Sequence, residues 1–454
     1  MSATAPAARF VPPHPPRRAG PVPVWRGFFG ERARTSVYGW SQQAYERWYI
    51  RRNVLGFTVH IPLHPDAVQQ VLLDNAANYV KPDIVKKLLR ATVGRGLLSS
   101  DGSLWREQRR IVAANFAPAA IDGLVPVFAE AARRAMHGWT DGVADLAAQA
   151  TATTMRIIAD SLFAGDTRLV SAESIAHIAA ALDGFSEARL QALLGLPPIP
   201  WSARGRRARR GQVFLRRTLT EVVESRLPDG GPDDFLGRLI RALTARFEPA
   251  EALALAVDNA ATFYLAGHET TANAVTWTLF LLSEQADLQD RAAAEARNAL
   301  GAGADDSDLP DRLPLLRLIL EETLRLYPPA PRFDRQAAAA DRLGAAEIAP
   351  GDIVSIWPWL IHRHRQLWDD PDAFDPDRFA PGGPERHRFQ YLPFGGGPRL
   401  CVGARFATAE ALTILAHWLG EWRFAPVSGH AVQPSGMVTL RPAGGLPLVL
   451  ARRV

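Results

Sequence analysis

The sequence contains very little cysteine and lysine. Its 454 residues include one cysteine, Cys401, which excludes an intramolecular disulfide framework and any zinc or iron–sulfur site that needs several cysteines. The only lysines are Lys81, Lys86 and Lys87, so nearly all positive charge is arginine. The net charge of +5 is small for this length and spread along the chain, which argues against a nucleic-acid partner.

Long apolar runs are also missing. No stretch approaches the roughly 18 apolar residues of a membrane span, and the N-terminus lacks a signal-peptide pattern. These absences predict a cytoplasmic protein with no transmembrane anchor. The arginine-rich run at residues 204–210 is open to two interpretations, a membrane-surface patch or a solvated loop face, and the second is favoured.

The hydrophobic content of 47% is enough for a large core, and no linker, repeat or compositional break divides the chain. Seven prolines among the first 23 residues predict an extended arm over 1–23, followed by a single domain over 24–454.

Hydrophobic periodicity predicts a fold that is mainly α with a small β part. Strand patterns are short, whereas helical spacing recurs over long segments. The strand candidates are 55–63 and 353–357, and the helical segments are 103–226, 249–285, 315–327 and 404–419.

Cys401 lies in a glycine-rich loop that leads directly into the last expected helix. Glycines such as Gly395 and Gly403 let backbone amides approach the sulfur, and the helix N-terminus adds positive charge. Both features favour the anionic thiolate, which is the metal-binding form. A lone cysteine is ordinarily a small buried residue, but this combination favours a ligand, and Arg399 is placed to meet an anionic group of a cofactor.

The loop resembles the Phe-x-x-Gly-x-Arg-x-Cys-x-Gly signature of the cytochrome P450 superfamily. It matches every specified position, at Phe394, Gly397, Arg399, Cys401 and Gly403. The resemblance implies a haem-thiolate monooxygenase of the soluble bacterial type, with Cys401 as the iron ligand of haem b and Phe394 packed near it. It also implies a triangular, mainly helical prism that holds haem between the 249–285 helix and the helix after the cysteine.

The 249–285 helix contains the motif Ala266-Gly-His-Glu-Thr-Thr271. Glycine and threonine weaken a helix locally, which favours a groove or kink. Considered by itself, the motif fits a packed helix with a surface glutamate equally well. The resemblance places Ala266 beside the haem and assigns proton delivery to Glu269 and Thr270, a task that needs a carboxyl beside a hydroxyl.

An ion pair is expected between Glu322 and Arg325, which are three residues apart on a helix, although such pairs are common. The resemblance adds Arg378 and implies a buried three-member network with a structural role.

Trp105 and Arg109 lie at i and i+4 on one helical face, where they can donate to the same anion. The resemblance assigns both of them, with Arg335 and Arg399, to the haem propionates.

The family topology implies a substrate pocket whose lining is largely apolar, and so a small hydrophobic organic substrate. Arg332 is left open, because it can recognise a carboxylate or face outward. The expected lining residues are Thr262, Phe263, Ala266, Thr270, Arg332 and Phe333.

The reaction needs O2 and two electrons, and one cysteine cannot hold an iron–sulfur cluster. The resemblance therefore implies a separate ferredoxin or flavodoxin-type donor with its reductase, and a monomer is expected. The expected docking face on the cysteine side consists of Arg106, Arg109, Arg110 and Arg405. Two alternatives, a haem peroxygenase and a non-catalytic haem sensor or carrier, are disfavoured because neither needs the Glu269–Thr270 pair.

Overall fold

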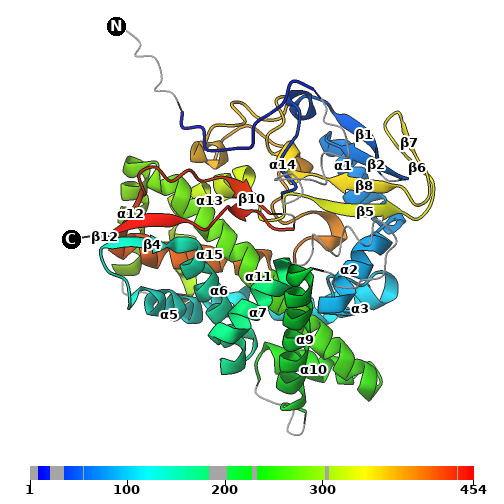
Figure 1. Ribbon diagram of the computed structural model, residues 1–454, viewed down its shortest axis with the longest axis horizontal. Helices are drawn as coiled ribbons and strands as arrows, with labels where there is room; N and C mark the ends of the chain where they lie inside the picture. Colours follow the sequence, from blue (N-terminus) through cyan, green and yellow to red (C-terminus); the bar gives the residue numbers. More distant parts are fainter. Residues whose placement is uncertain are drawn as a thin grey trace.

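The computed structural model describes residues 9–20, 35–54, 56–183, 202–227, 233–301, 306–436 and 438–453. Helices form most of the molecule, and the largest sheet lies to one side of them (Figure 1). This arrangement confirms the prediction of a mainly α fold with a small β part.

The helical body is built around α11 (Pro249–Ser283), a helix of 35 residues. Most of its side chains are buried on all faces, as expected for a helix at the centre of a large domain. It packs against α6, α10 and α15, so that it crosses the body beside the helix that follows Cys401 (Figure 1). The bounds of the α-helices are α1 Pro65–Gln69, α2 Asp83–Val93, α3 Gly102–Ala113, α4 Pro118–Asp122, α5 Val125–Met136, α6 Leu146–Leu162, α7 Ala172–Asp183, α9 Ala203–Glu224, α10 Phe235–Thr244, α12 Ala286–Gly301, α13 Pro314–Leu326, α14 Pro358–Ile361 and α15 Ala404–Glu421.

The largest sheet has the strand order β1-β2-β8-β5-β3. Its strands are antiparallel except for the β2–β8 pair, which is parallel. This sheet carries Arg335 on β5 and places β3 directly before Lys81, so it brings both cations toward the cysteine side of the body. The strands are β1 Tyr49–Val54, β2 Phe57–Pro62, β3 Tyr79–Val80, β5 Phe333–Ala337 and β8 Ile353–Ile356.

Three smaller sheets complete the β part. The C-terminal strand β12 lies between β4 and β9 in a three-stranded antiparallel sheet, and two hairpin-like pairs join β6 to β7 and β10 to β11. The strands are β4 Gly142–Asp145, β6 Asp341–Leu343, β7 Ala346–Ile348, β9 Trp422–Pro426, β10 Pro434–Ser435, β11 Arg441–Pro442 and β12 Pro447–Arg452.

The proline-rich segment packs against the body earlier than the sequence indicates. Residues 9–20 contain no helix, but the Tyr327 hydroxyl donates to the carbonyl of Pro13 at 2.6 Å. Arg17 forms a hydrogen-bonded ion pair with Asp372 (Nη1 to Oδ2, 2.7 Å) and lies over the Tyr45 ring. Packed structure therefore begins before residue 24, which itself lies outside the described residues. Proline-rich backbone cannot form helices, but its carbonyls still accept hydrogen bonds.

The arginine run at 204–210 is helical, as the helical spacing over 103–226 predicts, so the favoured interpretation of a solvated loop face is wrong. It forms the first turns of α9, whose N-terminus is capped by the Ser202 hydroxyl accepting from the Gly205 N–H at 2.9 Å. All five arginines are exposed, while Gly205, Ala208 and Gly211 are buried. A side chain at Gly211 would collide with the backbone of α7, so these small residues permit close helix packing.

Candidate functional site

The Cys401 loop is held in shape by two glycines with positive φ. Gly395 has φ +73° and Gly397 has φ +65°, conformations that side chains with a Cβ rarely adopt. A Cβ at Gly397 would also overlap the backbone carbonyl of Leu72. The Cys401 N–H donates to the Phe394 carbonyl at 2.9 Å and closes the loop immediately before α15. Glycine is therefore needed here both for backbone conformation and for close approach to the neighbouring chain.

The Cys401 side chain faces an accessible space deep inside the protein. Burial raises the pKa of its thiol, while the Gly403 N–H and the charge of Arg109 act in the opposite direction. The unligated cysteine is therefore a neutral thiol. A cation bound at the sulfur reverses this balance, because it supplies the opposite charge that the buried thiolate lacks.

A cluster of buried positive charge lies close to this loop. Burial and the neighbouring charges of Arg335 and Arg399 lower the pKa of Lys81 to about 7. Burial and Arg399 likewise lower the pKa of Arg335 to about 10. Asp101, which forms an ion pair with Arg399, is the carboxylate that these three cations share. Because a lysine with a pKa near 7 is only partly charged at neutral pH, the cluster carries an excess of between one and two positive charges, which the carboxylates of a bound cofactor would neutralise.

The structure brings Arg335 and Arg399 together as expected and adds Lys81, which the sequence analysis did not single out. The signal in the sequence that could have pointed to Lys81 is that it is one of only three lysines. Trp105 joins the cluster, because the Arg399 guanidinium lies 4.3 Å from its ring centre. Arg109 is placed apart from the cluster, beside Cys401, where its charge acts on the sulfur.

The acid and the hydroxyl of α11 are both engaged in hydrogen bonds. The Thr270 hydroxyl donates to the Ala266 carbonyl at 2.8 Å, and the Thr439 hydroxyl donates to Glu269 at 2.6 Å. Ala266 is exposed although Leu265 before it is buried, so open space lies against this part of the helix. The hydrogen-bonded helix continues without a break through this segment.

Gly267 serves close packing in this helix. A Cβ at this position would meet the Ile158 side chain of α6. His268 is buried with Nδ1 2.6 Å from the Tyr264 carbonyl. Gly267 therefore allows α11 and α6 to pack closely. It does not interrupt the helix.

Glu410 is a buried acid that sequence reasoning missed. It lies on α15 beside Thr271 of α11, and burial raises its pKa well above the usual value, which Thr271 offsets only in part. Burial therefore favours the neutral form of this carboxyl. The helical period of α15 places Glu410 on the face that packs against the rest of the protein. The sequence alone gives no reason to expect a buried acid at that position.

The expected ion network is present and fully buried. Arg325 donates two hydrogen bonds to Glu322 at 2.7 Å, and Arg378 Nε lies 3.2 Å from the same carboxylate. The remaining Arg325 N–H groups donate to the carbonyls of His362, Pro371 and Ala373. The network therefore fixes α13 to the segment that precedes the cysteine loop.

His362 extends this network to the cysteine loop and was not foreseen. Its Nε2 accepts from the Leu392 N–H at 2.7 Å, and its Nδ1 lies 3.2 Å from the Arg325 carbonyl. The Leu392 carbonyl in turn accepts from the Gly395 N–H at 3.2 Å. One buried imidazole therefore connects the ion network to the first turn of the loop.

Comparison with known proteins decides the family. The family model for cytochrome P450 matches residues 26–446. Cyclooctatin synthase from Streptomyces melanosporofaciens is 33% identical over 397 residues, which cover 86% of each chain. The chain belongs to the cytochrome P450 family. Cytochrome P450 714C3 from Oryza sativa subsp. japonica is 30% identical over 86% of this chain and 79% of its own length.

A solved structure agrees with the fold of this cytochrome P450. The crystal structure of the cytochrome P450DA haem domain matches it with a TM-score of 0.79 at 24% identity, covering 98% of both chains. Family membership makes the protein a haem-dependent monooxygenase that uses O2, an organic substrate and a redox partner. The resemblance inferred from the Phe394–Gly403 signature is thereby confirmed.

The expected substrate-pocket residues are not equally available in this cytochrome P450. The Thr262 hydroxyl donates to the Asp258 carbonyl at 2.8 Å. The Phe263 ring is buried in an aromatic cluster with Phe116 and Phe235.

Two further pocket candidates lie on and beside β5. Arg332 is paired with Asp334 at 2.8 Å and lies over the Trp357 ring, so it does not offer a free cation to a ligand. Phe333 of β5 packs against the cysteine loop. A Cβ added at Gly395 would lie within van der Waals range of its ring.

Carboxylates neutralise part of the expected docking face. Arg110 pairs with Glu107 at 2.8 Å and Arg405 pairs with Asp122 at 2.7 Å. Arg106 is exposed. Within the described residues, no single helix is long and apolar enough to cross a membrane, and one bent pair, Gly102–Phe116 with Pro118–Met136, meets that criterion only when combined.

Proposed function

We propose that Cys401 is the thiolate ligand of haem b and that the enzyme inserts one oxygen atom from O2 into a small hydrophobic substrate. The observation that carries this proposal is the buried excess of positive charge at Lys81, Arg335 and Arg399, close to a loop whose thiol is accessible. Two propionates and an iron match these two features together. Haem bound here supplies the activation of dioxygen.

The residues around the cofactor divide the remaining tasks. Arg399, Arg335 and Lys81 hold the propionates, and Trp105 supports the Arg399 guanidinium from the side. Arg109 and the Gly403 N–H stabilise negative charge on the sulfur, since both lower the pKa of the thiol. Phe394 closes the loop through its carbonyl.

Glu269 and Thr270 hold and transfer protons in this proposal. The Thr439 hydroxyl donates to the Glu269 carboxylate and fixes its orientation. The Thr270 hydroxyl already donates to the Ala266 carbonyl, so its oxygen lone pairs accept a proton donor from the open side of the helix. Glu269 is an acid and the neighbouring Thr270 hydroxyl is a hydrogen-bond acceptor, so together they form the start of a proton-transfer path.

A hydrophobic substrate is supported by the side chains that remain available. Ala266 is exposed on α11 and Leu98 is 39% exposed on the loop between α2 and α3, whereas Arg332 is already paired. With one cysteine and no cluster ligands, the chain needs electrons from elsewhere. We expect a separate ferredoxin or flavodoxin-type donor with its reductase.

The ligand assignment is tested with Cys401→Ser. We expect this variant to lose the carbon monoxide difference band of thiolate-ligated ferrous haem, because a serine oxygen is a much weaker electron donor. Leu400→Ser, which introduces the same residue at the exposed neighbouring position, should keep the band. Retention of the band in Cys401→Ser would refute the assignment.

The electron supply is tested on the wild-type holoenzyme. Product should form with a reduced ferredoxin and its reductase in the presence of O2. Turnover that requires hydrogen peroxide and ignores the ferredoxin would instead indicate a peroxygenase. A bound ligand that is never converted under either condition would indicate a sensor or carrier.

A further inference from the structure

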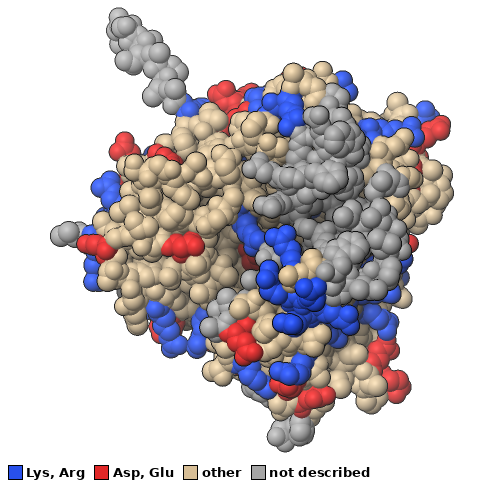
Figure 2. All heavy atoms as spheres, viewed as in Figure 1, with Lys and Arg blue, Asp and Glu red and all other residues tan. Residues whose placement is uncertain are grey.

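Lysine and arginine side chains gather on the face of the molecule that Figure 2 shows. This basic face combines cations of α2, of the loop after it and of the first turns of α9, two helices that contact each other (Figure 2). Its carboxylates Asp83, Asp101 and Glu251 pair with Lys86 and Arg95 and are fewer than its cations, so the face carries an excess of positive charge. The cations are Lys86, Arg90, Arg95, Arg204, Arg206, Arg207, Arg209 and Arg210.

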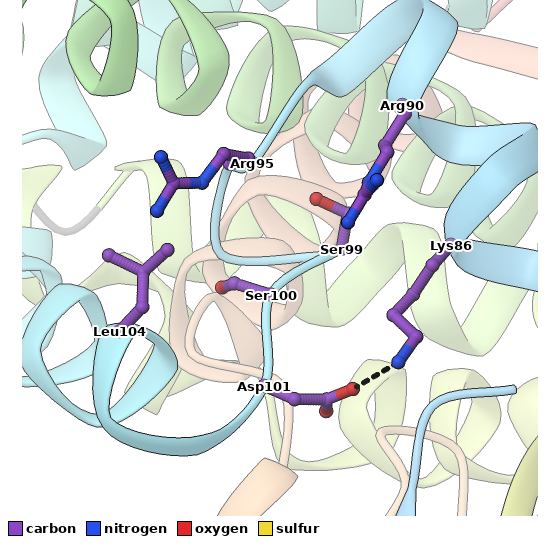
Figure 3. Close-up of a pocket in the computed structure, with 7 residues that line it drawn as sticks. All are labelled: Lys86, Arg90, Arg95, Ser99, Ser100, Asp101 and Leu104. Atoms are coloured by element: carbon purple, nitrogen blue, oxygen red, sulfur yellow. Dashed lines mark ion pairs between the residues drawn. The ribbon is translucent and has the colours of Figure 1, made fainter. Parts of the chain in front are cut away.

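A pocket of about 220 Å³ opens on the basic face, between α2, the loop and the start of α3. Lys86 and Arg90 extend into it from α2, and Arg95 comes from the loop (Figure 3). Ser99, Ser100, Asp101 and Leu104 complete the lining. Three cationic side chains therefore surround a small concave space.

The carboxylates near the pocket leave these cations available. Asp101 already pairs with Arg399 on the cofactor side and accepts from the Lys81 backbone N–H at 3.3 Å. Lys86 pairs with Asp83 at 2.9 Å and with the pocket-lining Asp101 at 3.5 Å (Figure 3). Arg95 pairs with Glu251 at 3.2 Å, and both Asp83 and Glu251 are exposed to solvent. Exposed pairs contribute little, about 0–1 kcal/mol, and are readily exchanged for a better partner.

Two further donors point to an anion at the same place. Asp101 precedes α3 without accepting a capping hydrogen bond, and the first turn of α3 contains no acidic residue, so the first N–H groups of this helix have no side-chain cap. The Ser100 hydroxyl accepts from the Gln108 side chain at 3.2 Å, which leaves its own proton free to donate. Helix N-terminus, hydroxyl and cations therefore converge from independent elements.

We propose that this pocket binds a phosphate group. A carboxylate offers one charge and two oxygens, whereas a phosphate offers up to two charges and at least three oxygens, which better match three cations, a hydroxyl and a helix N-terminus. The three cations of the pocket are distinct from those of the cluster around Arg399, although Asp101 pairs with both Lys86 and Arg399. The phosphate belongs either to a free small molecule or to a lipid headgroup.

Phosphate bound here would also stabilise the loop. The Arg95 N–H donates to Asp258 of α11 at 2.6 Å, and the Leu97 N–H donates to Asn259 at 3.0 Å. The loop is thus held by α11 on one side, and a phosphate would connect its other side to α2. Ligands that bind only the folded state raise its stability, so phosphate should raise the unfolding temperature.

The binding test uses the haem-loaded protein and inorganic phosphate in titration calorimetry, with chloride adjusted to keep the ionic strength constant. We expect saturable binding at one site and at least tenfold weaker binding in Arg90→Gln/Arg95→Gln. The matched control, Arg133→Gln/Arg134→Gln, removes two exposed arginines that pair with Glu130 of α5 and should bind phosphate like the wild type. No saturable binding, or equal weakening in both variants, would overturn the proposal.

Two probes distinguish the sources of the phosphate. Tighter binding of glycerol 3-phosphate than of inorganic phosphate, without cosedimentation with phosphatidic acid vesicles, identifies a free ligand. Cosedimentation that Arg90→Gln/Arg95→Gln abolishes identifies a lipid headgroup. Cosedimentation that depends on Arg207→Gln/Arg209→Gln of α9, and not on the pocket pair, would refute the pocket. The carbon monoxide band should be unchanged in every variant, so these outcomes are independent of the proposed monooxygenase site.

Discussion

The imidazole of His362 offers a sharp test of how the cysteine loop is held. The ring is fully buried between the Glu322–Arg325 network and Leu392, and its Nε2 must be unprotonated to accept the Leu392 N–H. Burial, reinforced by the charge of Arg325, lowers the pKa of His362 from 6.5 to about 3. The folded protein therefore keeps this histidine neutral over the whole range in which an unfolded histidine gains its proton.

This difference makes stability depend on pH in a defined direction. Above pH 6.5 the imidazole is neutral in both the folded and the unfolded state, so its titration does not change the free energy of unfolding. As the pH falls from 6.5 toward 3, only the unfolded state binds the proton, and the free energy of unfolding falls by about 1.4 kcal/mol per pH unit. His362 should therefore remove about 2 kcal/mol of stability between pH 7 and pH 5.

The assay is urea unfolding of the holoenzyme at pH 7 and pH 5, with wild type and His362→Gln compared. Glutamine keeps an acceptor for Leu392 and a donor for the Arg325 carbonyl but does not titrate, so its loss of stability between the two pH values should be smaller by about 2 kcal/mol. His430→Gln, at an exposed histidine, is the control and should behave like the wild type. If His362→Gln loses as much stability as wild type, the proposed link between this imidazole and the loop is wrong.

Three further outcomes follow from the same geometry. Thr270→Ala should lower product formed per electron consumed severalfold while haem content stays unchanged, and unchanged coupling would contradict the proton-transfer role. Arg325→Lys keeps the charge but loses at least two of five buried hydrogen bonds, so urea unfolding should show a loss of about 3–5 kcal/mol. Gly397→Ala forces a positive φ and a clash with Leu72, so it should destabilise the protein by at least about 3 kcal/mol and release haem at lower urea concentrations, whereas wild-type haem retention would contradict the packing argument.

Local features of this protein were readable because each is encoded in a continuous stretch of chain. The long helix was expected over 249–285 and spans Pro249–Ser283, since its apolar residues and its proline at the start act within one element. The cysteine loop was identified from ten consecutive residues. The arginine run at 204–210 was misread as a loop, because its charges hid the buried stripe of Gly205, Ala208 and Gly211.

The sequence by itself determined the mainly helical fold, the family and the residues proposed around Cys401, because these depend on spacing within single segments. Only the tertiary structure placed Lys81 with Arg335 and Arg399, buried Glu410 beside Thr271, and connected His362 to Leu392. It also gathered the basic face from α2 and α9, which are more than a hundred residues apart in the chain. Burial and electrostatic interaction depend on which segments pack together, and that choice is made by the fold as a whole.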